Sequence, residues 1–356
     1  MASAIDLSSL TMNNEEARDF VEVVFEKLYG DDGRISAAND IHTGVQMGTQ
    51  IPFFGVAGMI GKASSGCTPN AVSGVAVTQK LWEPKLFDAR LTHCQNDISQ
   101  LFKLWKRSPS GLATWEDVDN EQMAFLASMV VNSMVEAILR LTALGDTNAS
   151  PVGDATGDEL LTSGTTKAYF NLFDGYWPQI IDAVTGSLTT RYTITENGLG
   201  SKAAQIVLAA DRGLKTLRYL YNNADARLMA AENKVFVLTH SLFTNWVDYL
   251  EDQSLGFMLQ QTEEGSTKWL YRGIPIIVRP DWDRNIRAYW DNGTTYYFPH
   301  RAYLSTKANI PIGTSDEGDF TNFDAFYDRT DKQHYMDVAS YLDAKMLEPY
   351  MVIAAY

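Results

Sequence analysis

Cysteine and histidine are scarce in this chain. Among its 356 residues there are two cysteines, Cys67 and Cys94, and five histidines. Two cysteines make no disulfide framework; a single Cys67–Cys94 bridge and two buried free thiols both stay open as interpretations. No two histidines stand at the spacing of metal ligands, and CxxC and HExxH motifs are absent. The sequence therefore predicts no metal site.

Positive charge is also scarce. The chain holds 29 Lys and Arg against 44 Asp and Glu, which gives a formal net charge of −15. The densest basic stretch is Lys103, Lys106 and Arg107, which we interpret as the solvated C-terminus of a helix. A protein that grips nucleic acid needs a basic patch to displace counterions from the phosphates. If this protein meets DNA, we expect it to act as a container wall.

Long apolar runs are missing as well. The most apolar stretch, residues 123–144, is interrupted by Asn132, Glu136 and Arg140, which predicts an amphipathic helix and not a membrane span. The N-terminus has neither the basic nor the apolar region of a secretory signal. We therefore expect no association with a membrane.

Signatures of catalysis are absent too. There is no GxGxxG and no GxSxG elbow, and Gly61-Lys62 lacks the hydroxyl residue that would follow it in a phosphate loop. Asp316, Glu317 and Asp319 lack the frame of a calcium loop. We predict no catalytic, cofactor-binding or metal-binding residues and no enzymatic activity. A hydrolase whose carboxylates meet only in the fold is kept as a rival interpretation.

Apolar and aromatic residues, by contrast, are plentiful. Hydrophobic residues make up 45% of the chain, with 17 Tyr, 16 Phe and 8 Trp. This is enough for a sizeable core, although Trp and Tyr serve protein interfaces equally well.

The clearest periodic element is a helix over residues 120–144, predicted to be a rod about 36 Å long. Alternation over 73–94 predicts a long β-hairpin with Pro84 at its turn or a bulge. Residues 234–239 predict a buried strand. Helices are expected at 166–184, 200–211, 212–228 and from Ser241 to about 250, a second hairpin at 256–278, and β-structure over 336–355. Because the elements mix without a βαβ rhythm, the predicted class is α+β.

Three groups of short motifs, in order along the chain, resemble major capsid proteins of tailed bacteriophages, notably those infecting Bacteroidetes. The first group is QKLWEPK at 79–85 with CQNDI at 94–98, and the second is NLFDGYW at 171–177. The third comprises YRGIPI at 271–276, PDWD at 280–283, PHRA at 299–302, TKAN at 306–309, IGT at 312–314 and FYDR at 326–329. Each piece is weak alone, but the ordered set is specific.

The resemblance implies the HK97-type capsid fold, with an N-terminal arm, an extended hairpin (the E-loop), a peripheral domain with a long spine helix, and an axial domain. The implied boundaries are 1–72 for the arm, 73–97 for the E-loop, 98–165 for the peripheral domain, 166–313 for the axial domain, 314–346 for the return to the peripheral sheet, and 347–356 for a C-terminal strand.

The implied function is a major capsid protein that self-assembles through hexamers and pentamers into an icosahedral shell around double-stranded DNA, without sequence-specific binding. Portal, scaffold and accessory capsid proteins are the implied partners, the virion is the implied location, and the host cytoplasm is the implied place of assembly. An encapsulin-like shell of a cellular compartment is the alternative. Candidate inter-subunit contacts are the residues of the expected hairpin tip: Lys80, Trp82, Glu83, Pro84 and Lys85.

Overall fold

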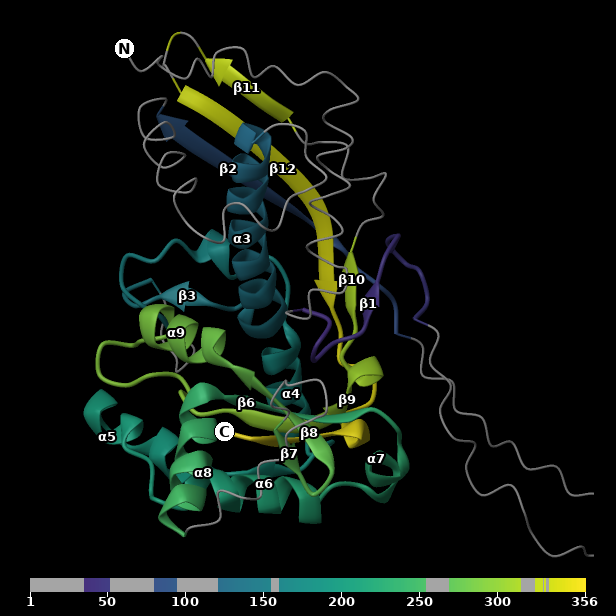
Figure 1. The fold of residues 1–356 in the computed structure, drawn as a ribbon, viewed down its shortest axis with the longest axis vertical. Helices are drawn as coiled ribbons and strands as arrows, with labels where there is room; N and C mark the ends of the chain where they lie inside the picture. The colour runs from purple at the N-terminus through teal and green to yellow at the C-terminus, as the bar shows by residue number, and fades with distance from the viewer. Residues whose placement is uncertain are drawn as a thin grey trace, which may run out of the picture.

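The computed structural model describes residues 35–51, 80–94, 121–154, 160–253, 269–314, 324–328, 330 and 333–356. These residues form two lobes, which lie one above the other in Figure 1. The upper lobe combines a curved sheet with one long helix. The lower lobe is a second sheet with helices on both faces. Most of the predicted N-terminal arm lies outside the described residues.

The long helix of the upper lobe is α3, Glu121–Leu144, which confirms the helix predicted at 120–144. Its C-terminal half buries Ile138 and Leu141, as the apolar spacing requires. The helix stops at Gly145, whose amide donates to the Leu141 carbonyl at 2.9 Å. A Cβ on Gly145 would lie 2.7 Å from the carbonyl oxygen of Phe173. The absence of a side chain at Gly145 therefore lets the backbone of Phe173 pass close to the end of the helix.

The sheet of the upper lobe is organised around its longest strand, β12, Gln333–Ala344. On one side, β12 pairs antiparallel with β2, Lys85–Cys94. On the other side it pairs antiparallel with β11, Asp324–Asp328, and then with β10, Ile312–Thr314. The short strand β1, Ile41–His42, adds in parallel to β10.

The β-hairpin predicted over 73–94, with its turn at Pro84, is wrong for the described residues. After Pro84 the chain forms β2, which pairs with β12. Before Pro84, residues 80–82 pair with residues 48–51 through an antiparallel bridge and three backbone hydrogen bonds. Alternation marks a strand without naming its partner, so the sequence pattern did not separate these pairings. Residues 73–79 lie outside the described part of the chain.

The lower lobe contains a mixed six-stranded sheet. In spatial order its strands are β5 (Arg191–Tyr192), β13 (Val352–Ala355), β9 (Ala302–Thr306), β6 (Lys234–Thr239), β8 (Ile274–Arg279) and β7 (Leu270–Tyr271). β6 and β8 run parallel, and helix α8, His240–Asp252, lies in the connection between them. This is a single βαβ unit and not the repeated βαβ rhythm whose absence the sequence indicates. The rest of the sheet is mostly antiparallel, which fits the predicted α+β class.

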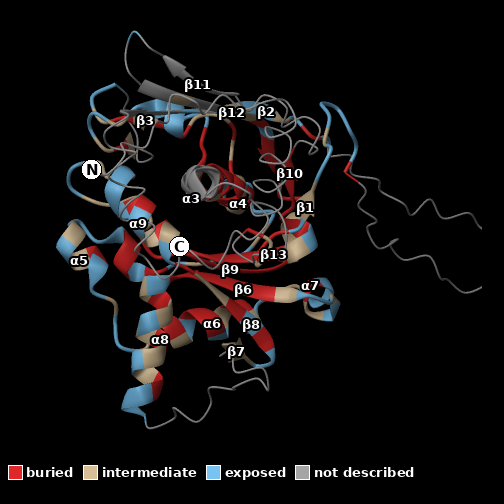
Figure 2. Ribbon diagram, turned by 45° about the horizontal axis from the view of Figure 1, so that its top comes forward, coloured by how far each residue is buried: buried red, intermediate tan, exposed pale blue. Residues whose placement is uncertain are grey.

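The strand β6 shows why this sheet needs cover on both faces. Val235 and Val237 face one core, while Phe236 and Leu238 face the other, and all four side chains are buried. A strand buried on both faces carries a continuous apolar run. Buried residues follow β6 and β9 through the middle of the lower lobe in Figure 2.

Helices supply that cover. Aromatic residues of α4 and α9 join the first core, and α6 and α8 join the second. The remaining helices of the described chain are α4 (Tyr176–Thr185), α5 (Lys202–Ile206), α6 (Arg212–Asn222), α7 (Ala226–Ala230) and α9 (Pro280–Tyr289), with the 3-10 turns η3 (Lys167–Tyr169), η4 (Thr195–Gly198), η6 (Lys307–Asn309) and η8 (Pro349–Met351). A separate two-stranded ladder joins β3 (Ser150–Pro151) to β4 (Leu160–Leu161).

A cluster of aromatic rings fills the first core. Trp177, Trp282 and Tyr303 are fully buried. The two indoles meet edge to face with their centroids 5.3 Å apart, and Tyr303 lies 5.8 Å from Trp177. Such pairs contribute about 0.5–1.5 kcal/mol each beyond the burial of their surface. The abundant aromatics therefore serve the core, at least at these positions.

Helix α9 was not predicted, although its start carries standard signals. Pro280 is at the first helical position, and Asp281 and Asp283 lie in the first turn. Proline is preorganised for that position, and acids there complement the helix dipole. Residues 280–283 contribute the PDWD motif to the resemblance, but the sequence predicts no helix there.

The contact between α6 and α8 yields a stability prediction. A Cβ on Gly213 would lie 2.5 Å from the Leu242 carbonyl oxygen and 2.8 Å from Trp246 Cβ. We expect Gly213→Ala to lower the free energy of unfolding by about 1–3 kcal/mol, the usual cost of overpacking. Gly198→Ala is the control, because a Cβ there meets nothing within 4 Å. Equal urea midpoints for the two variants would contradict the packing.

Candidate inter-subunit site

The candidate contact residues lie where two distant segments of the chain meet. Gly48 donates its amide to the Trp82 carbonyl at 2.9 Å, Trp82 donates to Thr49 at 3.0 Å, and Ile51 donates to Lys80 at 3.0 Å. We call this paired region, residues 48–51 with residues 80–82, the stem. The stem thus holds two segments that are distant in the sequence side by side.

Trp82 packs the stem onto the upper sheet. Its side chain is only 2% exposed and contacts Ile51 and Leu347. The ring lies directly on β10, since a Cβ on Gly313 would be 2.8 Å from Trp82 Cε3 and Cζ3. The His42 ring flanks it, with the two centroids 5.8 Å apart. Trp82 is therefore a core residue of its own chain, while its role in a contact between subunits stays a prediction.

A buried carboxylate fastens the residue next to Trp82. Asp343, 1% exposed, accepts hydrogen bonds from the backbone amides of Glu83 and Ala344, both at 2.8 Å. Lys345 lies 3.5 Å from the same carboxylate. Burial raises the pKa of Asp343, against the opposing effects of these hydrogen bonds and of Lys345. Two backbone donors and one cation offset only part of the cost of burying this charge.

Lys80 is also directed to its own chain. Its ammonium donates to the Met346 carbonyl at 2.8 Å. Burial, followed by repulsion from Lys345, lowers the pKa of Lys80. The lysine thus ties the stem to the segment that leaves β12.

The other candidate residues face outward. Glu83 and Lys85 are exposed, and Pro84 is partly exposed. Leu86, 51% exposed, is the register partner of Tyr341, 44% exposed, so the two lie side by side on the sheet. Exposed apolar groups of this size on adjacent strands are typical of surfaces that another protein covers. The structure thus separates the five candidates into an inward pair, Lys80 and Trp82, and an outward group.

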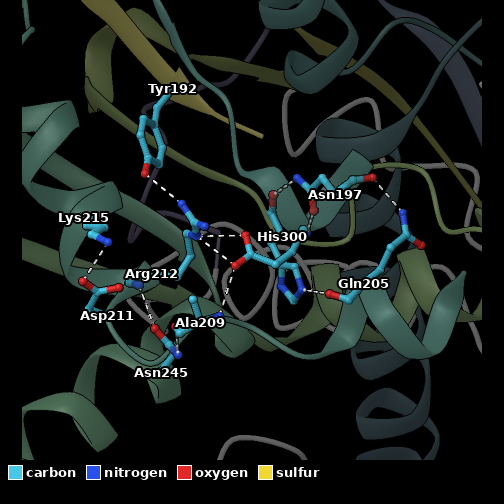
Figure 3. A network of polar contacts seen from close by, with 11 residues as sticks. Tyr192, Asn197, Gln205, Ala209, Asp211, Arg212, Lys215, Asn245 and His300 are labelled. Atoms are coloured by element: carbon cyan, nitrogen blue, oxygen red, sulfur yellow. Dashed lines mark hydrogen bonds and ion pairs between the residues drawn. The ribbon is translucent and has the colours of Figure 1, made fainter. Parts of the chain in front are cut away.

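A second polar cluster lies at the edge of the lower lobe, around His300 (Figure 3). The His300 ring is fully buried, with Nε2 2.8 Å from the Gln205 carbonyl oxygen and Nδ1 2.7 Å from Ser241 Oγ. The carbonyl can only accept, so Nε2 carries the proton and Nδ1 accepts from Ser241. Asn197 encloses the backbone of His300, accepting from its amide and donating to its carbonyl.

An ion pair extends this cluster toward α6. Arg212 Nε lies 2.8 Å from Glu196 Oε2, and the guanidinium also donates to the Tyr192 hydroxyl at 3.0 Å. Glu196 Oε1 accepts from the Ala209 amide at 3.1 Å. Both side chains of the ion pair are largely buried. The cluster holds the irregular segment between β5 and α6 against the sheet (Figure 3).

The Ser241–His300 pair is not the start of a hydrolase site. The imidazole is 0% exposed, so no substrate reaches it, and its second nitrogen is bonded to a backbone carbonyl, not to a carboxylate. Among the described residues there is no group of three or more His, Cys, Asp or Glu that could hold a metal ion. The acidic cluster at 316–319 lies outside those residues. In the part of the chain that is described, no helix combines the length and apolar character needed to cross a membrane.

The architecture, two lobes joined by crossing strands beside a long helix, is that of a capsid protein. The satellite phage P4 procapsid with its size determination (Sid) protein matches with a TM-score of 0.50 at 10% identity, over 94% of this chain and 96% of that chain. The capsid of the empty GTA particle matches at 0.45 (10% identity; 91% and 90% covered), and the capsid of Myoviridae phage XM1 at 0.43 (10%; 89% and 89%). No protein-family model and no curated protein match the sequence.

The fold is accordingly the HK97-type capsid fold that the motif resemblance implied. The P4 match carries this conclusion, because it extends over nearly the whole of both chains. At 10% identity it concerns the fold and not the individual contact residues.

The buried His300 yields a prediction on pH. Burial lowers its pKa below the usual 6.5, with Asp283 and Glu196 opposing and Arg287 assisting the shift. A lowered pKa means that the unfolded chain binds the proton more readily, so stability falls as pH drops below about 6.5. We expect the free energy of unfolding to lose up to about 1.4 kcal/mol per pH unit in that range.

Urea titrations between pH 7.5 and 5 measure this slope for wild type and for His300→Gln, which should flatten it. His240→Gln is the matched control, since His240 is exposed and its ring has one long contact, 3.4 Å to Thr244. An unchanged slope in His300→Gln would refute the assignment.

Proposed function

We propose that this protein is the major capsid protein of a tailed bacteriophage, which assembles through hexamers and pentamers into an icosahedral shell around double-stranded DNA. The observation that supports this most is the fold match to the satellite phage P4 procapsid over 94% of this chain and 96% of that one. A likeness of that extent includes both lobes and the long helix together, which a single shared motif would not give.

A fold alone does not fix a function, so the chemistry of this chain matters as well. The Ser241–His300 pair is closed to substrates, because His300 is fully buried. Exposed apolar side chains, Leu86 and Tyr341, stand on the upper sheet. The net charge of −15 suits a wall that repels the DNA it encloses. These features support a structural role without enzymatic activity.

The finer parts of the proposal concern partners and place. Copies of the chain itself are the main partner, and portal, scaffold and accessory capsid proteins complete the particle. The shell forms in the host cytoplasm and its final location is the virion. The domain boundaries implied by the resemblance belong to the same proposal, with one change. Residues 85–94, implied as part of the E-loop, are assigned to the upper sheet, since β2 pairs with β12.

A cellular compartment shell of the encapsulin type is the alternative. An encapsulin-type shell would share this fold. We favour the phage shell because the P4 structure, which matches with a TM-score of 0.50, is a phage procapsid. The alternative would require a packaged cargo protein in place of DNA.

Purified, overexpressed protein tests the proposal directly. We expect closed icosahedral particles, or hexamers and pentamers that convert to them, in size-exclusion chromatography and negative-stain electron microscopy. A compact monomer that never assembles, even with the products of its neighbouring genes, would contradict the shell function. Particles that copurify with one cellular protein and no DNA would favour the compartment.

The outward-facing candidates Glu83, Pro84 and Lys85 lead to a second test. We propose that they contact a neighbouring subunit, and we expect Lys85→Glu to reduce particle yield without changing the stability of the isolated subunit. Substitutions of exposed charges usually change stability by about 0.5 kcal/mol or less. Lys167→Glu, at an exposed lysine of η3, is the control. Wild-type yield from Lys85→Glu would remove this residue from the interface.

A further inference from the structure

The most buried residue of the stem is also its largest. Trp82 is 2% exposed, so it offers almost no surface to a neighbouring copy. The three residues that follow it are the candidate contacts Glu83, Pro84 and Lys85, which are exposed or partly exposed. A buried residue in that place acts on its exposed neighbours by fixing the position of the backbone they share.

Three independent contacts converge on the stem. The Trp82 ring rests on the bare backbone of Gly313 in β10. The Asp343 carboxylate holds the amide of Glu83 at 2.8 Å, and the Lys80 ammonium holds the Met346 carbonyl at 2.8 Å. Asp343 is the second-last residue of strand β12, just before the chain crosses to the lower lobe. The stem is thus fixed to both β10 and β12, the strands that continue into the lower lobe.

Gly313 leaves free the space that the Trp82 ring occupies. Gly313 is paired on both sides, in register with His42 of β1 and with Asp343 of β12, so its backbone has little freedom to move. Any side chain there would enter the space of the indole, because its Cβ would lie 2.8 Å from two ring carbons. The position of Trp82 is therefore set by a rigid surface and not by a flexible neighbour.

We propose that Trp82, seated on Gly313, is a positioning residue for assembly: it holds the backbone of the stem, and with it the outward-facing Glu83, Pro84 and Lys85, in the geometry in which a second copy of this chain meets the fold. This inference rests on the proposed shell function. Trp82 itself touches no neighbouring copy. Its effect on assembly passes through the backbone of the stem.

The first test measures the stem in unassembled subunits by hydrogen exchange. In Trp82→Ala, the amides of Ile51 and Trp82, which both donate within the stem, should exchange faster by about tenfold or more. The amide of Thr239, which donates to Arg301 in the lower sheet, should keep its protection. Unchanged protection of the stem amides would overturn the positioning role, whatever the assembly result.

The second test measures particle yield at matched folded fraction. Trp82→Ala should lower the yield by about tenfold or more, a change of about 1.4 kcal/mol in the assembly equilibrium, while Trp82→Phe should recover most of it. Trp246→Ala is the control, since Trp246 is a buried tryptophan of the lower lobe, 4% exposed. If Trp82→Ala assembles as well as Trp246→Ala, the inference is wrong.

A double-mutant cycle keeps the inference testable if Trp82→Ala folds poorly. Gly313→Ala alone should displace the indole and reduce yield. In the Trp82→Ala background the same substitution should add no further loss, because the ring is gone. Additive losses of particle yield would show that Trp82 and Gly313 do not act through the same contact. Wild-type protein that never assembles would refute the proposed function and the assembly role together, while the exchange data would still decide whether Trp82 holds the stem.

Discussion

The packing of the Trp82 ring on the bare backbone of Gly313 is the contact on which the arrangement of this molecule depends. It lies at the junction of the two lobes, where β10 and β12 both continue into the lower sheet. Asn309 stabilises that crossing by donating to the Glu348 carbonyl and accepting from the Glu348 amide. One indole thereby connects the stem, the upper sheet and the crossing strands. Three segments far apart in the sequence share a single packed point.

Buried and exposed residues have different roles in this arrangement. The aromatic cores of the lower lobe, with Trp177, Trp282 and Tyr303 fully buried, make a rigid body. The stem then fixes the backbone that carries Glu83, Pro84 and Lys85, and exposed groups such as Leu86 and Tyr341 remain on the sheet surface. A shell subunit needs both properties, because neighbours with the same shape must meet at repeated angles. A stiff body and a fixed position for the outward residues supply that geometry.

The sequence predicted the elements that carry strong local periodicity. Helix α3 and strand β6 appear where apolar spacing placed them, since burial of one or both faces leaves a direct pattern. The hairpin over 73–94 failed because alternation identifies strands but not their partners, and β2 pairs with a strand more than 200 residues later. The packing of Trp82 within its own chain could not be predicted for the same reason, because nothing local to this residue identifies Gly313 as its contact.

A cryo-electron microscopy reconstruction of the assembled particle, at a resolution that shows side chains, tests the central claim most directly. We expect that in every copy Trp82 packs on Gly313 of its own chain and that Glu83, Pro84 and Lys85 contact a neighbouring copy. Trp82 inserted into a neighbouring subunit, or residues 48–51 and 80–82 separated in the shell, would contradict it.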